Sequence, residues 1–243
     1  MARKLRIAHL YPDQMNIYGD RGNILTLRQR SLWRSIDVAI DAIQPGMQTD
    51  WSGYDLAFFG GGQDSGQSLI AADFVQRQGQ ELRAAVEDGL VMLTICGGYQ
   101  LLGHYFLTHT GEKLPGVGIM DVHTVGGTRR LIGNIVIDWT PGTERLVGFE
   151  NHSGRTYLGS GAEPLGRVLK GFGNNGEDQT EGAVYRNVHG CYIHGSLLPK
   201  NPHFADHLIG LALERRYGIR AELEPLDDHL ERTAHDVMVA RVT

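Results

Sequence analysis

The segment from Val91 to Gly103 constrains the possible folds of this chain more than any other segment. An apolar run from Val91 to Ile95 stops at Cys96, and two glycines and a helix-like stretch follow. This pattern predicts a buried strand that turns sharply into a helix, with the cysteine held at the turn above an α/β sheet. The first N–H groups of that helix would favour the thiolate, which is the reactive form of cysteine. The alternative is a buried cysteine at the end of a core strand, since free cysteine is among the most buried residue types.

Strand-like and helix-like segments alternate around this turn, and such alternation predicts an α/β fold with a mostly parallel central sheet flanked by helices. In sheets of this kind, reactive groups gather at the carboxyl ends of the strands. Both Gly60-Gly-Gly62 and Cys96 fall at such ends. Strands are expected at Leu5–Leu10, Val38–Ile43, Asp55–Phe59 and Leu90–Ile95, and helices at about 22–34, over the apolar spacing from Leu69 to Val86, and directly after Cys96.

The pattern changes after about Met120, where shorter strands and a turn-rich loop over 170–181 are expected. A helix over about 202–217 ends the predicted core, which spans about residues 5–217. Residues 218–243 form a charged extension, and its part from 227 to 239 is either a terminal helix or a mobile tail. No repeat or linker divides the sequence, so a single domain over 1–243 is predicted. The shorter strands are expected at Ile132–Trp139, Val168–Lys170, Gly182–Tyr185 and His189–Ile193.

Composition excludes several classes of protein. The net charge of −5 argues against binding to nucleic acid or to a membrane surface through basic residues. No stretch approaches the roughly 18 uninterrupted apolar residues of a membrane span, and no signal-peptide core follows the charged N-terminus. With only two cysteines, Cys96 and Cys191, a disulfide framework is not expected, and the reducing cytoplasm is the expected location.

A cysteine nucleophile needs a base and an oxyanion site, and the chain offers a candidate for each. His194 ends an apolar strand about 100 residues after Cys96, a separation that the fold can close; a structural histidine in a loop is the alternative. The backbone N–H groups of Gly62 and Gly97 could form an oxyanion hole. A phosphate cradle at Gly60-Gly-Gly62 is the competing interpretation, but neither the P-loop nor the dinucleotide pattern is present.

Two histidines, His203 and His207, have the i, i+4 spacing of paired metal ligands on a helix. The sequence lacks the glutamate of the zincin pattern and a third nearby ligand, so we expect both histidines to be solvated and no metal to be bound. Cys191 is most simply a buried strand residue.

Four features in this order resemble the class I glutamine amidotransferases, and more narrowly their cobyric-acid-synthase-type branch. These are the upstream triple glycine, Cys96-Gly-Gly-Tyr-Gln100 after a strand, the segment 148–156 and His194. The resemblance covers about residues 5–215 and implies the class I (flavodoxin-like) fold. It also implies attack of the Cys96 thiolate on the side-chain amide of L-glutamine, with His194 as base and then acid.

The same resemblance assigns substrate contacts. Gln100 matches a position that touches the substrate glutamine, and Arg130 is the expected ligand of the α-carboxylate, with Arg129 as the near alternative. The usual glutamate two residues after the histidine is replaced here by Ser196, as is general in this branch, so the group that orients the imidazole stays open. Thr94 replaces a common glycine and could crowd the turn.

The segment Tyr11–Asn23 and the segment Gly148–Thr156 resemble the GatD family, the glutaminase subunits of lipid II isoglutaminyl synthases. The family implies a cytoplasmic heterodimer with a MurT-like, Mur-ligase-family subunit that uses ATP to amidate the D-glutamate of the peptidoglycan stem peptide. Glu150, His152, Arg155, Asp20 and Arg21 would support the pocket or the partner surface. No cofactor is expected. The alternatives are an amidotransferase for a corrinoid, another cysteine hydrolase, and a non-catalytic binding module.

Overall fold

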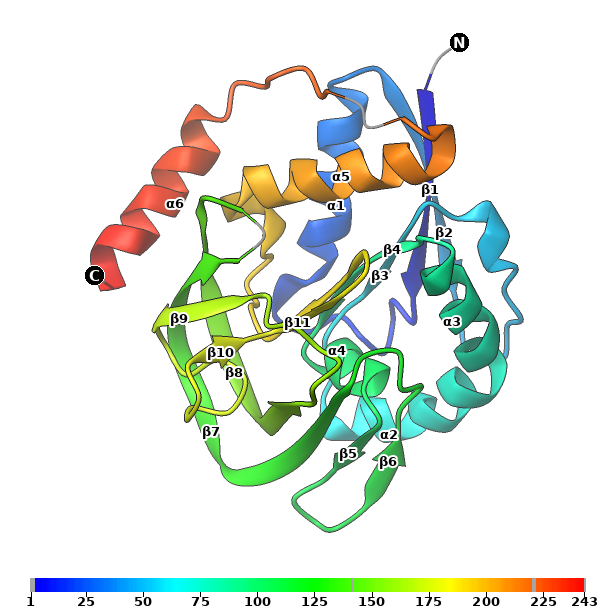
Figure 1. Ribbon diagram of the computed structural model, residues 1–243, viewed down its shortest axis with the longest axis vertical. Coiled ribbons are helices and arrows are strands. Elements are labelled where there is room, and N and C mark those ends of the chain that lie inside the picture. Colours follow the sequence, from blue (N-terminus) through cyan, green and yellow to red (C-terminus); the bar gives the residue numbers. More distant parts are fainter. Residues whose placement is uncertain (1–2, 141, 220–221, 243) are drawn as a thin grey trace.

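The computed structural model describes residues 3–140, 142–219 and 222–242, and its central element is a six-stranded sheet (Figure 1). The strand order is β11-β12-β4-β3-β1-β2, and every neighbouring pair is parallel except β11 and β12. The predicted α/β class with a mostly parallel sheet is confirmed. The strands are β1 (Arg3–Leu10), β2 (Ile36–Ile43), β3 (Leu56–Phe59), β4 (Val91–Ile95), β11 (Ala183–Tyr185) and β12 (Val188–Cys191).

Helices connect these strands, and most lie where the apolar spacing places them. Helix α1 packs against α5 and β2, and α5 also contacts β1 and β4. The helix expected to run up to Gly89 is divided by a π-helical turn over Phe74–Gln78, which lets Phe74 and Gln78 both face the core. The helices are α1 (Arg21–Leu32), α2 (Asp64–Asp73), α3 (Gly79–Glu87), α4 (Gly97–Leu102), α5 (Pro202–Tyr217) and α6 (His229–Val242).

The chain reverses its direction across the sheet at β1. Strand β2 lies on one side of β1, whereas β3, β4 and β12 follow on the other side. Open α/β sheets bind their ligands outside the carboxyl ends of the strands at such a reversal. The segments that leave β1, β3, β4 and β12 therefore meet at one edge of the sheet, and each of them carries a residue of the site described below.

A second, mainly antiparallel sheet lies beside the first (Figure 1). Its centre is a long hairpin of β7 and β8, of which the sequence predicted only the part from Ile132 to Trp139. Along β8 the residues that face inward include Glu150, His152 and Thr156, so no apolar alternation marks the strand. The strands are β5 (Tyr105–Leu107), β6 (Lys113–Pro115), β7 (Val122–Trp139), β8 (Arg145–Leu158), β9 (Gly166–Lys170) and β10 (Thr180–Glu181).

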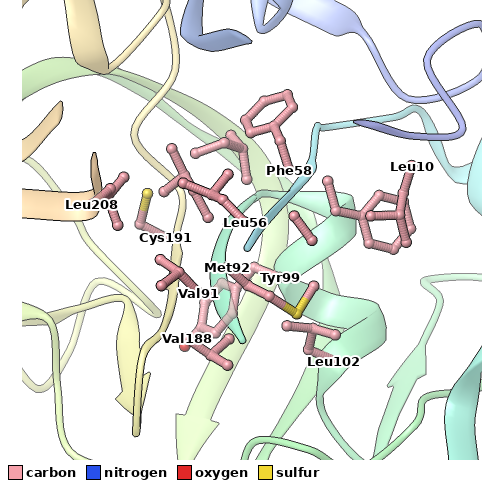
Figure 2. Packing of buried hydrophobic residues seen from close by; sticks show 14 of the residues in the cluster. Leu10, Leu56, Phe58, Val91, Met92, Tyr99, Leu102, Val188, Cys191 and Leu208 are labelled. Carbon is pink, nitrogen blue, oxygen red and sulfur yellow. The ribbon is translucent and has the colours of Figure 1, made fainter. Parts of the chain in front are cut away.

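The core fills the space between the parallel sheet and its helices (Figure 2). Leu10, Phe58, Met92 and Cys191 are fully buried in it, so the prediction that Cys191 is a buried strand residue is confirmed. Strands buried on both faces need such continuous apolar runs.

The charged extension after α5 ends in a helix, which decides between the two forms expected for it. It is fastened to the core through Arg30 of α1, whose guanidinium bonds Asp206 at 2.7 Å and Asp228 at 2.5 Å. Residues 220, 221 and 243 of the predicted extension lie outside the described residues. Within the described ranges, no helix has the length and apolar character needed to cross a membrane.

Candidate active site

The turn after β4 has the predicted strand–turn–helix geometry. Cys96 has φ 49° and ψ −104°, a conformation that non-glycine residues rarely adopt. The residue is only 6% exposed, and its N–H donates to the Cys191 carbonyl at 2.8 Å. A Cβ on Gly98 would lie 2.6 Å from the Phe59 carbonyl oxygen, so α4 passes directly over the end of β3. Thr94 does not crowd the turn, because its hydroxyl is directed toward the His189 carbonyl at 3.5 Å.

His194 leaves the end of β12 and is fully buried beside the cysteine. Its backbone pairs with Phe149 of β8, which joins the two sheets at this point. Burial alone would lower the pKa of the imidazole, but the neighbouring Cys96 thiolate and the Asp20 carboxylate raise that pKa to about 10. The raised pKa means that the protonated imidazole is stabilised at this position.

Asp20 is the group that orients the imidazole, and the sequence analysis left this role open. Its Oδ1 lies 3.3 Å from His194 Nδ1, and its Oδ2 accepts a hydrogen bond from the N–H of Gly61 at 2.7 Å. The residue is fully buried at the start of α1, in the loop that follows β1. A signal for it exists in the sequence, since an acid in the loop after the first strand falls at the same sheet edge as Cys96.

Ser196, which occupies the position of the usual glutamate, supports Asp20 indirectly. Its hydroxyl donates to the Gly19 carbonyl at 2.6 Å, so it holds the residue next to Asp20. The usual glutamate would bond the imidazole directly, whereas Ser196 anchors the loop that carries Asp20.

A cavity of about 360 Å³ opens above the cysteine, within the range of small-molecule pockets. Of the residues predicted for catalysis, the oxyanion hole or substrate binding, Cys96, Gly62, Gln100 and Arg130 line it, whereas His194 and Gly97 are not among its lining residues. It is lined by Ile17, Tyr18, Gly62, Gln63, Gln67, Cys96, Gln100, Phe106, Arg130, Asn151, His152, Ser153 and Gly154.

Arg130 lines this cavity, whereas Arg129 is not among its lining residues. Its Nε donates to Asn151 Oδ1 at 2.7 Å and one terminal nitrogen donates to the Asn151 carbonyl at 2.9 Å, which holds the guanidinium at the cavity wall. The Arg129 carbonyl instead accepts a hydrogen bond from Arg155. Arg155 therefore shapes the β7–β8 hairpin beside the cavity.

Gln100 is held in one orientation from both ends. Its Oε1 accepts from Gln67 Nε2 at 2.9 Å, and its Nε2 donates to the Tyr192 hydroxyl at 2.9 Å. That hydroxyl lies 2.6 Å from the Thr156 hydroxyl. These hydrogen bonds are buried, and together they fix the orientation of the Gln100 carboxamide.

The triple glycine also allows close packing against neighbouring residues, which the sequence did not predict. A Cβ on Gly60 would collide with the Met15 carbonyl oxygen, and one on Gly62 would collide with the Met15 sulfur. A Cβ on Gly61 would lie 2.8 Å from His194 Cε1. The glycines thus let the loop that carries Asp20 lie directly on the end of β3.

Two polar residues of β8 are structural supports. Glu150 is fully buried and accepts hydrogen bonds from the N–H groups of Phe172 and Gly173 at 2.7 and 3.0 Å. His152 stacks on the Tyr192 ring at a centroid distance of 3.7 Å, and burial lowers the pKa of its imidazole. The stack holds the ring of Tyr192, whose hydroxyl accepts the hydrogen bond from Gln100.

A larger cavity of about 760 Å³ lies at the opposite edge of the parallel sheet, near the amino ends of β3 and β4. Four of its charged groups already bond one another, in the ion pairs of Arg216 with Asp55 and of Arg215 with Asp88. It holds no cysteine and none of the predicted site residues. The smaller cavity is therefore the better candidate for chemistry.

The expectation that His203 and His207 are solvated is wrong. Both rings contact Trp139, at centroid distances of 5.9 and 5.0 Å. The apolar face of α5 turns them toward the β7–β8 hairpin, so they are packing residues. No group of three or more histidine, cysteine or acidic side chains is placed to hold a metal ion in the part of the chain that the structure describes.

Comparison with known proteins agrees with this geometry. The model of the CobB/CobQ-like glutamine amidotransferase domain matches residues 6–202. A glutamine amidotransferase from Thermotoga maritima has a similar structure, with a TM-score of 0.55 over 97% of this chain and 94% of that one. At 15% identity, this likeness shows the fold alone.

Two curated relatives align along nearly the whole chain. The lipid II isoglutaminyl synthase (glutamine-hydrolyzing) subunit GatD of Staphylococcus aureus is 44% identical over 98% of this chain and 96% of its own length. The subunit of the same name from Streptococcus pneumoniae is 41% identical over 94% and 88%. A probable cobyric acid synthase from Methanothermobacter thermautotrophicus is 36% identical, but over only 56% of this chain and 28% of its own length. Because the family model spans most of the sequence and the GatD subunits align along almost all of it, the chain belongs to the CobB/CobQ-like glutamine amidotransferases and to their GatD branch.

Proposed function

We propose that this chain is the glutaminase subunit of a lipid II isoglutaminyl synthase, which hydrolyses L-glutamine and delivers ammonia to a separate ligase subunit. The observation that carries the proposal is the meeting of Cys96, His194 and Asp20 at one edge of the sheet, beside a cavity of suitable size. The full-length similarity to two subunits named for glutamine hydrolysis supports the same reaction.

The reaction begins when His194 takes up the proton of the Cys96 thiol, which leaves the thiolate as the nucleophile. The sulfur attacks the side-chain amide carbon of glutamine, and the negative charge that develops on the amide oxygen is stabilised by the N–H groups of Gly62 and Gly97. Donors of this kind contribute about 3–4 kcal/mol each in other enzymes. The Gly61 N–H is already bound to Asp20, so it holds the acid in place.

The protonated His194 then donates to the leaving nitrogen, and ammonia departs. Asp20 stabilises the imidazolium and keeps Nε2 directed at the reacting atoms, because its own bond is to Nδ1. Water attacks the resulting thioester and releases glutamate, which restores the cysteine.

Arg130 binds the α-carboxylate of the substrate. Two of its nitrogens are bonded to Asn151, which fixes the plane of the guanidinium and leaves its remaining terminal nitrogen for the ligand. Gln100 contacts the substrate from α4, one turn beyond the cysteine.

Ammonia is useful only if an acceptor receives it, and both GatD relatives are named as subunits of a larger synthase. The partner in this proposal is a MurT-like subunit of the Mur-ligase type, which forms a heterodimer with this chain in the cytoplasm. The amidated group is the D-glutamate of the lipid II stem peptide. The single-domain organisation over residues 1–243 is part of the same proposal.

The test is a reconstituted assay with the ligase subunit from the same genome. Lipid II amidation is followed by mass spectrometry with L-glutamine or with ammonium as nitrogen source. Cys96→Ser is expected to abolish the glutamine-dependent reaction and to leave the ammonium-dependent reaction intact. Full glutamine-dependent activity in Cys96→Ser would exclude the mechanism, and glutamine-dependent amidation of a corrinoid in place of lipid II would exclude the acceptor.

A further inference from the structure

Gln67 carries a buried polar atom for which the mechanism above has no use. The residue belongs to α2 and lines the same cavity as Cys96, although it is only 1% exposed. Its Nε2 lies 2.9 Å from Gln100 Oε1 and 3.5 Å from the Gly62 carbonyl oxygen. Both neighbours are acceptors, so they orient the amide with its nitrogen toward them. The other atom, Oε1, has no hydrogen-bond partner among the described residues.

The position of this side chain relative to the nucleophile limits which part of a substrate it can meet. A Cβ on Gly97 would collide with Gln67 Nε2, so the carboxamide of Gln67 lies directly against the first residue of α4. Helices α2 and α4 are packed against each other (Figure 1). Gly97 follows Cys96 in the chain, and the reacting carbon of the substrate must approach the Cys96 sulfur. The part of the substrate nearest Gln67 is therefore its reacting amide, since Arg130 takes the α-carboxylate.

We propose that Gln67 Oε1 accepts a hydrogen bond from the N–H of the substrate's side-chain carboxamide and so selects a carboxamide over a carboxylate at the reacting carbon. This inference rests on the proposed glutaminase function and adds a specificity-determining residue to it. A buried carbonyl oxygen without a donor is unfavourable, and the substrate amide supplies the missing donor. A γ-carboxylate has no proton to offer and would place negative oxygens against Gln67 Oε1. The glutamate product would be released more readily for the same reason.

The experiment compares two substrates on the full-length protein with its ligase subunit: L-glutamine and the γ-methyl ester of L-glutamate, which has no N–H at the reacting group. Gln67→Leu is expected to lower kcat/KM for glutamine by roughly 3- to 10-fold, the effect of losing one hydrogen bond, and to change the ester reaction by less than about 2-fold. Gln67→Met, which keeps the length of the side chain, provides the same comparison in case the leucine variant melts early.

The matched control is Gln78→Leu, which also removes a buried carboxamide. Gln78 bonds Trp51 and the Met47 carbonyl and lies outside the cavity. Its substitution is expected to leave the ratio of amide to ester hydrolysis unchanged. Equal losses on both substrates in Gln67→Leu and Gln67→Met would overturn the inference, because Gln67 would then act only by holding Gln100. A wild-type protein that hydrolyses neither substrate would overturn the proposed function, and this inference with it.

Discussion

Replacing Asp20 with asparagine tests how the imidazole is held. The carboxylate makes two bonds, to His194 Nδ1 at 3.3 Å and to the Gly61 N–H at 2.7 Å. Asparagine has one acceptor oxygen, so its NH₂ group would face one of these two donors. The structure predicts the loss of one charge-assisted hydrogen bond, worth about 1.5–3 kcal/mol, which corresponds to roughly a 10- to 150-fold lower kcat/KM.

The pH dependence of the same variant gives a second readout. Against the effect of burial, the Cys96 thiolate and then Asp20 raise the pKa of His194 to about 10. A raised histidine pKa means that the protonated form is stabilised in the folded protein, and that this stabilisation is lost as the pH rises through the folded value. Without the Asp20 charge the pKa falls. The alkaline limb of kcat/KM is therefore expected to move to lower pH in Asp20→Asn.

The matched control is Asp13→Asn, because Asp13 lies in the same loop but is exposed and bonded to Gln44. Rates of glutamate release across the pH range are to be measured for both variants. An Asp20→Asn variant with less than about 3-fold loss and an unmoved alkaline limb would refute the assignment of Asp20 as the orienting group.

Three further predictions concern packing and binding. Gly98→Ala places a Cβ 2.6 Å from the Phe59 carbonyl oxygen, so it is expected to cost about 1–3 kcal/mol of stability in denaturant titration and to lower kcat by shifting the turn. Arg130→Lys loses the planar fork and is expected to raise KM for glutamine about 10-fold, whereas Arg129→Lys is expected to stay within about 2-fold of wild type in the same steady-state assay. Arg30→Met leaves two carboxylates without their shared partner, and since these are partly exposed, a loss of about 1–3 kcal/mol is expected in thermal unfolding.

The helices and strands that the sequence predicted are those whose apolar residues recur at the spacing typical of a helix or of a buried strand. Strand β4 is a continuous apolar run and is buried at every position. Helix α5 begins and ends where the apolar spacing and the glycine at 218 place it. Strand β8 could not be found in this way, because its inward positions carry glycine and polar residues that serve the site. The single-domain organisation stays a prediction, which one cooperative unfolding transition would support.

The site residues that could be predicted from the sequence are those whose chemical role allows few residue types. A strand-to-helix turn followed by glycines is typical of an exposed nucleophile, so Cys96 stands out, and a strand-end histidine is the base expected for it. Asp20 could not be assigned in the same way, because acids are common in loops and its role depends on distances across 174 positions of sequence. Gln67 is harder still to find, since a glutamine on a helix is usually a surface residue.

Backbone strain supports the same location for the site. Tyr18, Cys96 and Ser196 all have positive φ values, of 52°, 49° and 50°. Cys96 is the proposed nucleophile, and the other two residues lie beside the catalytic groups. The Tyr18 ring lies 5.0 Å from the His194 ring, and the Ser196 hydroxyl anchors the loop before Asp20. Each such conformation costs on the order of 1–3 kcal/mol and persists only where neighbouring groups enforce it. Three of them around one imidazole therefore indicate that stability is lost here in order to hold a nucleophile, its base and an acid in one arrangement.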